Sequence, residues 1–389
     1  MSPSSRRATL LDTIGPDTLL GLYLAKEPRV WTGIATQDDL LSWDDLNELL
    51  NYRPFDPARM RLARDRRTVA HESYTVAGPY GRTVNPSLFH TLLQEGASLV
   101  VDAVDRMHPG TGDTAAALER LTRCNVLTNL YASWTATQAF GLHFDDQDVL
   151  VVQLAGAKRW QFYAPTRAAV MLHDPVAAPR PTGEPDRDFV LHAGDVLFLP
   201  RGWWHGAAAG EGTHSLHVTH TMIPVTGIDL MRWIIPQLHA EEVFRHDLPA
   251  HAGPDARAAW AQKLADSVRA IAAAPDVLDR FLAERDVRYD ARRSTALPYA
   301  VDRGEPPAGR LRLIASRSLV VTGPDGSPLF AAGGMHWRLT APRHQVALTL
   351  ADGAAHDLAE LRAVVKPEDW DDVHTYLGEL VFHGVAVWE

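Results

Sequence analysis

Residues 125–221 consist of short apolar runs separated by Gly, Pro and Asp turns, and no other feature of the sequence constrains the fold as strongly. Runs of about four to eight residues bounded by such turns predict strands. Several short strands without long helices between them indicate an antiparallel barrel or sandwich. The predicted strands are Asn125–Ala132, Val149–Leu154, Trp160–Tyr163, Val196–Leu199 and Ser215–Thr221.

Helical patterns flank this β-rich region on both sides. Residues 9–120 are expected to be mostly helices and loops, because residues 36–50 and 86–107 carry apolar side chains at helical spacing. Residues 229–238 and 255–273, after the β-rich region, show the same spacing. The chain is therefore predicted to be a β core with helices attached on either side.

The C-terminal part has its own order of elements. A linker at residues 301–309 contains Pro and Gly, and strand-like runs follow it. Helices near residues 357–364 and 370–383 and a terminal strand at 385–388 fit a small winged-helix-like domain. The predicted domains are residues 1–225, with a barrel core at about 120–225; residues 226–305, helical and linker; and residues 306–389, winged-helix-like.

The amino-acid composition limits the binding partners and the cellular compartments that we expect for this chain. There are 38 Lys and Arg residues against 48 Asp and Glu, a net charge of −10, which argues against nonspecific nucleic-acid binding. Asp369, Asp371 and Asp372 crowd a candidate DNA-contacting helix, so direct nucleic-acid binding is not expected. No apolar run reaches the roughly 18 residues of a membrane span. The single cysteine, Cys124, and the lack of a signal-peptide pattern predict a cytoplasmic protein.

The segment Gly141-Leu142-His143-Phe144-Asp145 carries the strongest chemical signal. In a strand, residues two apart point to the same face, so His143 and Asp145 would lie together while Phe144 points away. Two histidines and one carboxylate form a facial triad that leaves coordination positions open on a non-haem Fe(II) ion. This pair would supply two of the three ligands.

A third ligand has two candidates further along the chain. His205 follows a turn and the short strand Val196–Leu199, which suits delivery of a side chain to the mouth of a barrel. His217 lies on the polar face of the strand Ser215–Thr221, where it is a ligand, a substrate contact or a core histidine. We expect His205 to be the ligand, with His217 as the rival.

Lys158 begins a predicted strand after the turn at Gly156. A lysine inside a barrel is costly unless an anion pairs with it, and the far carboxylate of a metal-chelating dicarboxylate is such an anion. A solvated turn lysine is an equally good interpretation of this position. Tyr131 and Asn129 share one face of an earlier strand and are further candidates for hydrogen bonds to the same ligand.

Several of these motifs, in this order, resemble the JmjC-type ribosomal oxygenase family, the cupin-4 group of Fe(II)- and 2-oxoglutarate-dependent protein hydroxylases. The resemblance is dense over residues 125–225 and looser after them. The motifs that carry it are Asn129-Leu-Tyr131, Gly141-Leu-His143-Phe-Asp145-Asp, Gln153-Leu-Ala-Gly156-Ala-Lys158-Arg-Trp160, Gly194-Asp195-Val-Leu-Phe-Leu-Pro200-Arg-Gly-Trp-Trp-His205 and Ser215-Leu-His217-Val-Thr219.

The resemblance implies a double-stranded β-helix with flanking helices, and it implies a role for each matching residue. His143, Asp145 and His205 would hold Fe(II). Lys158 would bind the C5 carboxylate of 2-oxoglutarate, with Tyr131 assisting. Ser215 and Asn129 would contact cosubstrate or substrate, and the helical region after the barrel would make a homodimer.

The implied activity is hydroxylation of an Arg or His side chain in a protein or peptide, with a ribosomal protein as one candidate. Residues 136–140 lack the proline-rich loop of some family members, so the ribosomal target does not follow directly. The alternatives are an oxygenase acting on a small metabolite, a biosynthetic peptide or an RNA base, and a metal-binding cupin module without catalysis.

Overall fold

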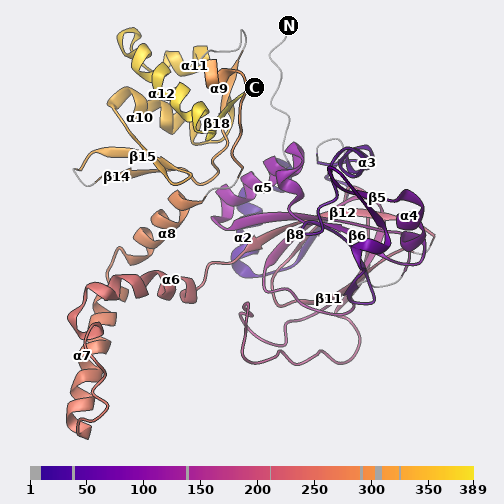
Figure 1. Cartoon of the computed structure of the whole chain (residues 1–389), viewed down its shortest axis with the longest axis horizontal. Coiled ribbons are helices and arrows are strands. Elements are labelled where there is room, and N and C mark those ends of the chain that lie inside the picture. Colours follow the sequence, from indigo (N-terminus) through magenta and orange to yellow (C-terminus); the bar gives the residue numbers. More distant parts are fainter. Residues whose placement is uncertain are drawn as a thin grey trace. The chain divides into compact units, whose positions relative to one another are not determined.

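The computed structural model describes residues 10–36, 40–136, 140–210, 212–289, 292–302, 309–323 and 326–389. The chain divides into two compact units, Met1–Pro224 and Val225–Glu389 (Figure 1). Within the described residues, no helix has the length and apolar character needed to cross a membrane. The division into residues 1–225, 226–305 and 306–389 stays a prediction, and most of the expected linker at 301–309 lies outside the described residues.

The first unit is built on an antiparallel sheet, and each predicted strand of residues 125–221 lies in it (Figure 1). The strand order is β1 (Arg29–Trp31), β10 (Val196–Leu199), β8 (Asp148–Tyr163), β12 (Ser215–Ile223), β7 (Asn125–Ser133), β6 (Ser98–Val101), β2 (Met60–Arg64) and β3 (Arg67–Thr68). Two more strands, β9 (Arg187–His192) and β11 (Trp204–Ala209), pair with β8 off this path.

Strand β8 joins two sets of strands because it bends. Its first part pairs with β10 and β12, and its second part, from Ala157 onward, pairs with β9 and β11. The predicted strands 149–154 and 160–163 are therefore one strand. Gly156 lies at the bend with φ +65°, and a Cβ there would come within 1.8 Å of the His214 carbonyl oxygen. Only glycine fits this position, because the left-handed backbone and the close contact both exclude a side chain.

Alternate residues of β8 face two different apolar clusters. Leu150 and Val152 pack into a large cluster that includes residues of α1 (Leu10–Ile14), α2 (Pro16–Ala25) and α5 (Pro109–Thr122). Val149 and Val151 belong to a smaller cluster with Trp160 and Phe162. The helices therefore cover one face of the sheet, and the other face lines the interior of the barrel, as period-two alternation requires.

The helices expected before residue 120 are shorter than predicted. The helix α4 (Pro86–Gln94) ends before Gly96, whose φ of +99° breaks the helical path, and the buried strand β6 follows. The prediction of one helix over 86–107 was wrong because Ser98-Leu-Val-Val is an apolar run that a helix and a buried strand share. Further strands of this region are β4 (Thr75–Gly78) and β5 (Gly81–Val84).

The helix expected over 36–50 begins later, at α3 (Trp43–Tyr52). Ser42 caps it: the Ser42 hydroxyl accepts from the Asp45 backbone N–H, and the Asp45 carboxylate accepts from the Ser42 N–H. This reciprocal capping box fixes the helix start at Ser42 rather than at Thr36. Residues 37–39 lie outside the described residues.

The second unit begins with helices and ends with a mixed α and β region (Figure 1). Its helices include α6 (Gly227–Ile234), α7 (Pro254–Ala272), α8 (Val277–Arg288), α10 (Ala341–Leu350), α11 (Leu358–Ala363) and α12 (Trp370–Phe382). Its strands form two sheets: β17 (Ala355–Asp357), β13 (Arg310–Leu313) and β18 (Ala386–Trp388); and β14 (Leu319–Thr322), β15 (Pro328–Ala332) and β16 (Met335–Arg338). The helices predicted near 357–364 and 370–383 are present.

Candidate metal centre

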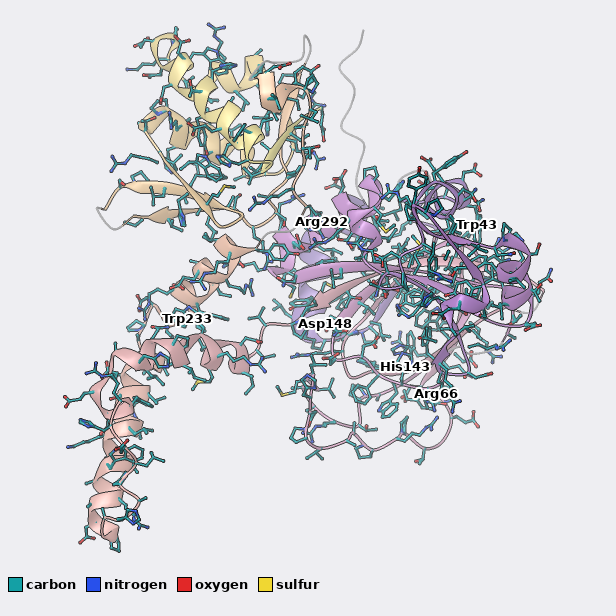
Figure 2. The ribbon with its side chains drawn as sticks, viewed as in Figure 1. Trp43, Arg66, His143, Asp148, Trp233 and Arg292 are labelled. Atoms are coloured by element: carbon teal, nitrogen blue, oxygen red, sulfur yellow. The ribbon has the colours of Figure 1, made fainter. Side chains whose placement is uncertain are left out.

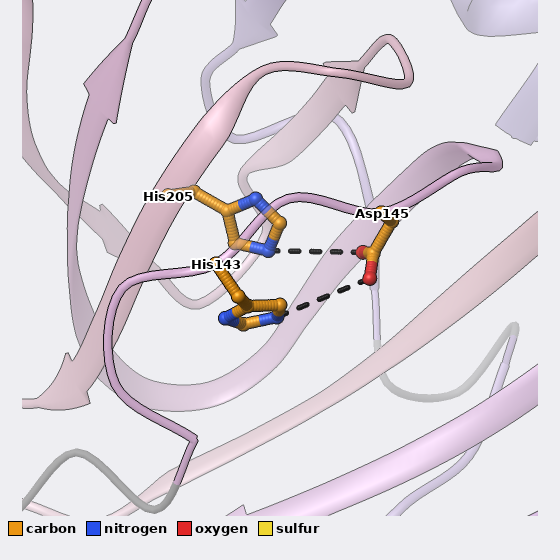
Figure 3. Close-up of side chains that lie close together, drawn as sticks. All are labelled: His143, Asp145 and His205. Carbon is orange, nitrogen blue, oxygen red and sulfur yellow. Dashed lines mark ion pairs between the residues drawn. The ribbon is translucent and has the colours of Figure 1, made fainter. Parts of the chain in front are cut away.

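The two halves of the candidate centre meet through the backbone. His143 lies in the loop between β7 and β8, and His205 lies on β11 (Figure 3). The backbone N–H of His143 donates to the backbone carbonyl of His205 over 3.0 Å, and the backbone N–H of His205 donates to the backbone carbonyl of His143 over 2.6 Å. The Gly202 N–H also donates to the Asp145 carbonyl over 2.9 Å. Residues 141–145 do not form the strand that we predicted: only His143 makes an isolated bridge, to His205.

The three side chains nevertheless converge as predicted. His143 Nε2 lies 3.9 Å from Asp145 Oδ1, and His205 Nε2 lies 3.7 Å from Asp145 Oδ2 (Figure 3). One ligand atom from each of the three residues lies within 4.8 Å of the other two. Among the described residues, His143, Asp145 and His205 form the group whose side chains could hold a metal ion. His217 is not part of this group.

Both imidazole rings are oriented by the same local contact. His143 Nδ1 lies 2.9 Å from the Gly141 carbonyl oxygen, and His205 Nδ1 lies 3.1 Å from the Trp203 carbonyl oxygen. Since a carbonyl only accepts, each Nδ1 carries the proton and each Nε2 presents its lone pair toward Asp145. Burial lowers the pKa of His205, against the opposing effect of Asp145, and so favours the neutral ring that binds metals.

This donor set fits a divalent transition metal. Two imidazole nitrogens and one carboxylate oxygen are the ligands of a facial triad, which leaves the other positions of an octahedral ion open. Phe144 packs away from the centre against Trp204, with ring centroids 4.9 Å apart. The Trp204 Nε1–H in turn donates to Thr166 Oγ1 over 2.9 Å, so the loop after β8 supports the outer side of the centre.

Lys158 lies within strand β8, paired with β9 and β11, and is partly buried rather than at a solvated turn. Burial lowers the pKa of its ammonium to about 7, and among the described residues no carboxylate forms an ion pair with it. Its Nζ lies 6.0 Å from the centroid of the Tyr131 ring. A buried cation without a protein anion is costly, so this position favours an anionic ligand.

Aromatic rings connect Lys158 with the three converging side chains. Tyr131 stacks on His217 with centroids 4.9 Å apart and planes at 9°, and Trp160 lies 5.8 Å from His205 and 6.2 Å from His217. Burial raises the pKa of Tyr131 to about 12, so its hydroxyl stays protonated and can donate. Trp160 Nε1 and His217 Nδ1 are buried and have no hydrogen-bond partner among the described residues. These polar atoms fit a pocket for a polar ligand.

The remaining predicted residues already have partners in the protein. Ser215 is fully buried, and its Oγ accepts from Gln153 Nε2 over 2.9 Å. Asn129 Oδ1 accepts from the Ala103 N–H over 3.1 Å. A side-chain hydrogen bond between Asn129 and Tyr131 opposes the effect of burial on the pKa of Tyr131. The Ser215 hydroxyl and the Asn129 amide oxygen are therefore engaged in hydrogen bonds within the protein.

Some residues at the centre were missed by the sequence analysis. Asp148, fully buried at the start of β8, accepts from the Arg201 N–H over 3.1 Å. Arg66, from the β2–β3 turn, donates to the carbonyls of Phe140 and Leu142 over 3.1 and 3.5 Å; Figure 2 labels Arg66 and Asp148. A carboxylate directly before the apolar run Val149-Leu-Val-Val was the available signal for Asp148. No local signal pointed to Arg66.

The comparison with protein families identifies the domain that holds this centre. Residues 108–230 match the family model described as the JmjC domain, so the chain contains a JmjC domain. A curated relative from Drosophila persimilis, the "Bifunctional lysine-specific demethylase and histidyl-hydroxylase NO66", is 33% identical over 141 residues, 36% of this chain and 20% of that protein. The relative of the same description from Culex quinquefasciatus is 27% identical over 60% of this chain and 37% of that protein. The chain thus matches between 20 and 37% of the length of these relatives.

Solved structures share the architecture of almost the whole chain. The Escherichia coli ycfD structure covers 96% of this chain and 98% of its own, with a TM-score of 0.58 and 20% identity. The structure of YcfD, described as a ribosomal oxygenase from Escherichia coli in complex with cobalt and 2-oxoglutarate, covers 93% of this chain and 95% of its own, with a TM-score of 0.55 and 19% identity. The predicted fold class, a JmjC-type β core with flanking helices, is confirmed.

Proposed function

We propose that this chain is an Fe(II)- and 2-oxoglutarate-dependent oxygenase that hydroxylates an Arg or His side chain of a protein or peptide. The observation that carries the proposal is the convergence of His143, Asp145 and His205 within 4.8 Å, with both Nε2 atoms turned toward the carboxylate. A JmjC domain and the oxygenase and hydroxylase names of the relatives support it.

His143, Asp145 and His205 would hold Fe(II) through Nε2, a carboxylate oxygen and Nε2. With 2-oxoglutarate and dioxygen, the bound ion supplies the oxidising power that converts a C–H bond to C–OH while 2-oxoglutarate becomes succinate and CO2. The protein contributes orientation. The hydrogen bonds from the two Nδ1 atoms to the Gly141 and Trp203 carbonyls keep both rings in the metal-binding tautomer.

Lys158 would pair with the carboxylate of 2-oxoglutarate that lies away from the metal. Its burial supports this role, because an anion there restores the charged form of the ammonium. The protonated Tyr131 hydroxyl would donate a hydrogen bond to the same ligand. Trp160 and His217 would exclude water from the pocket walls.

The substrate class is inferred from the relatives and from charge. One relative is named a histidyl-hydroxylase and the structural neighbour a ribosomal oxygenase, so a basic side chain of a ribosomal protein is the first candidate. The net charge of −10 suits a basic peptide. Part of the segment 136–140, which lacks a proline-rich loop, lies outside the described residues.

The test measures succinate formed from 2-oxoglutarate by Fe(II)-loaded protein, with mass spectrometry of candidate peptides for the gain of one oxygen atom. We expect His143→Ala to abolish turnover and Mn(II) binding by calorimetry. His205→Ala should also abolish Mn(II) binding, whereas His217→Ala should retain it, because of these two histidines it is His205 that presents its Nε2 to Asp145. The reverse result for these two histidines would show that the ligand assignment is wrong.

Other outcomes distinguish the alternatives. Metal binding without 2-oxoglutarate binding would favour a non-catalytic cupin module. Turnover with no oxidised peptide would favour a small metabolite or an RNA base as the substrate. We further propose that the chain forms a homodimer and is cytoplasmic, a location that suits its one cysteine, Cys124, a buried free thiol.

A further inference from the structure

Asp148 is a fully buried carboxylate that links the two segments of the candidate metal centre. It begins β8, three residues after Asp145, and its side chain has no solvent exposure. Its Oδ1 accepts from the backbone N–H of Arg201 over 3.1 Å. Arg201 belongs to the turn that leads into β11 and His205. One carboxylate therefore lies on the segment of Asp145 and contacts the segment of His205.

The other carboxylate oxygen fixes this link to helix α2. Lys26 Nζ lies 2.7 Å from Asp148 Oδ2, and the same ammonium lies 3.9 Å from the centroid of the Tyr23 ring. The Tyr23 hydroxyl is 3.1 Å from Cys124 Sγ, which is buried. The lysine is thus held between an aromatic face and a carboxylate.

Lys26 lies at the C-terminal end of helix α2. Lys26 ends α2 in the left-handed region, with φ +57° and its N–H bonded to the Leu22 carbonyl. This helix-ending position favours glycine or asparagine, because other side chains are strained there. From this position the Lys26 side chain reaches the Asp148 carboxylate.

We propose that Asp148, held by Lys26, is a positioning residue of the metal centre. It fixes the turn before His205 relative to Asp145, together with the hydrogen bond from the Gly202 N–H to the Asp145 carbonyl. The ligand atoms are then in place before an ion binds. The inference rests on the proposed function, since it assumes that the three converging side chains bind a metal.

The experiment measures Mn(II) affinity by titration calorimetry on the full, metal-free chain, with thermal unfolding of each variant measured in parallel. Removing a residue that orients metal ligands typically weakens metal binding by about 10- to 100-fold, and we expect this loss for Asp148→Ala. Asp148→Asn can still accept the Arg201 N–H, so its affinity should lie between those of Asp148→Ala and wild type. Lys26→Met, which removes the anchor, should also weaken Mn(II) binding.

The matched control is Asp105, another buried carboxylate of the same unit, which accepts from the Thr128 N–H of strand β7 over 2.7 Å. Asp105→Ala should lower the unfolding temperature and leave Mn(II) affinity unchanged. If Asp148→Ala fails to fold, Asp148→Asn and Lys26→Met carry the test.

Two results would overturn the inference. The first is that the folded Asp148 and Lys26 variants bind Mn(II) as tightly as wild type does. If His143→Ala still loses the metal, this first result leaves the proposed function intact. An equal loss of affinity in Asp105→Ala would also overturn it, because the effect would then be general destabilisation. If wild-type protein bound no Mn(II), the proposed function itself would fail, and the inference with it.

Discussion

His143 and His205 each bond through Nδ1 to the carbonyl of the residue two positions earlier, Gly141 and Trp203. The same short contact therefore sets the tautomer of both rings, although they come from distant parts of the chain. The sequence contains the residue types and the His-x-Asp spacing that predict a ligand pair. The sequence does not show which carbonyl oxygen each imidazole ring contacts, because this contact depends on the local conformation of the backbone.

The sequence alone could not decide whether His205 or His217 is the third ligand. Both histidines follow or lie in predicted strands, and both are buried. Their difference comes from long-range pairing: His217 lies opposite Tyr131 in the β7–β12 ladder, next to an irregularity in the β8–β12 ladder, whereas His205 bridges to His143. A register of this kind is a property of the whole sheet.

Lys158 gives a pH-dependent prediction. Burial lowers the pKa of its ammonium to about 7 in the folded chain, against 10.5 for the ordinary side chain. Between these values the unfolded chain binds the extra proton, so the free energy of unfolding rises with pH in this window. One proton gives a slope of at most about 1.4 kcal/mol per pH unit.

The measurement compares urea unfolding of wild type and Lys158→Met at pH 7 and pH 9, without metal or 2-oxoglutarate. The stability of wild type relative to the variant should increase from pH 7 to pH 9, because the buried ammonium loses its proton. Equal changes in both proteins would show that Lys158 keeps an ordinary pKa in the folded state.

At the scale of elements, the bend in β8 could not be predicted from local pattern. The run Gly156-Ala-Lys158 looks like a turn between two strands, and it was interpreted as one. The structure instead continues the strand through Gly156 and gives its two parts different partners. A similar ambiguity affected residues 98–101, where an apolar run was assigned to a helix but pairs with β2 and β7.

Gly156→Ala tests the bend. The added Cβ would lie 1.8 Å from the His214 carbonyl oxygen at a backbone φ of +65°, so the strand or its neighbour must move. We expect the free energy of unfolding to fall by about 3 kcal/mol or more, measured by chemical denaturation.

The control for this substitution is Gly21→Ala, in helix α2 of the same unit, where nothing lies within 4 Å of the added Cβ. Because alanine favours a helix interior over glycine, Gly21→Ala should raise stability by about 0.5–1 kcal/mol. Comparable stability of Gly156→Ala and wild type would mean that the bend tolerates a side chain.

At the scale of the whole molecule, the second unit carries an apolar surface that suits self-association. Ile228, Met231 and Ile235 are exposed by 45, 39 and 53%, at spacings that place them on one side of α6 and the turn after it. The helix α7 has no buried residue along its length. Contiguous exposed apolar patches mark interaction sites, and the resemblance to the oxygenase family implies a homodimer through this region.

The dimer prediction is tested by sedimentation of the Ile228→Asp/Ile235→Asp protein, which should shift from dimer to monomer because charge is placed in the apolar contact. Arg232→Ala changes an exposed polar residue of the same helix and should leave the mass unchanged. A monomeric wild type, or an unchanged dimer in the double variant, would contradict the assignment of α6 to the interface.

The paired backbone hydrogen bonds between His143 and His205 have a consequence for handling the protein. These bonds use main-chain groups and none of the candidate ligand atoms, so we expect the two segments to stay joined when a chelator removes the ion. One preparation can then be stripped and reconstituted with Fe(II), Co(II) or Mn(II) in turn, and the reactivity of each metal can be compared on an identical polypeptide.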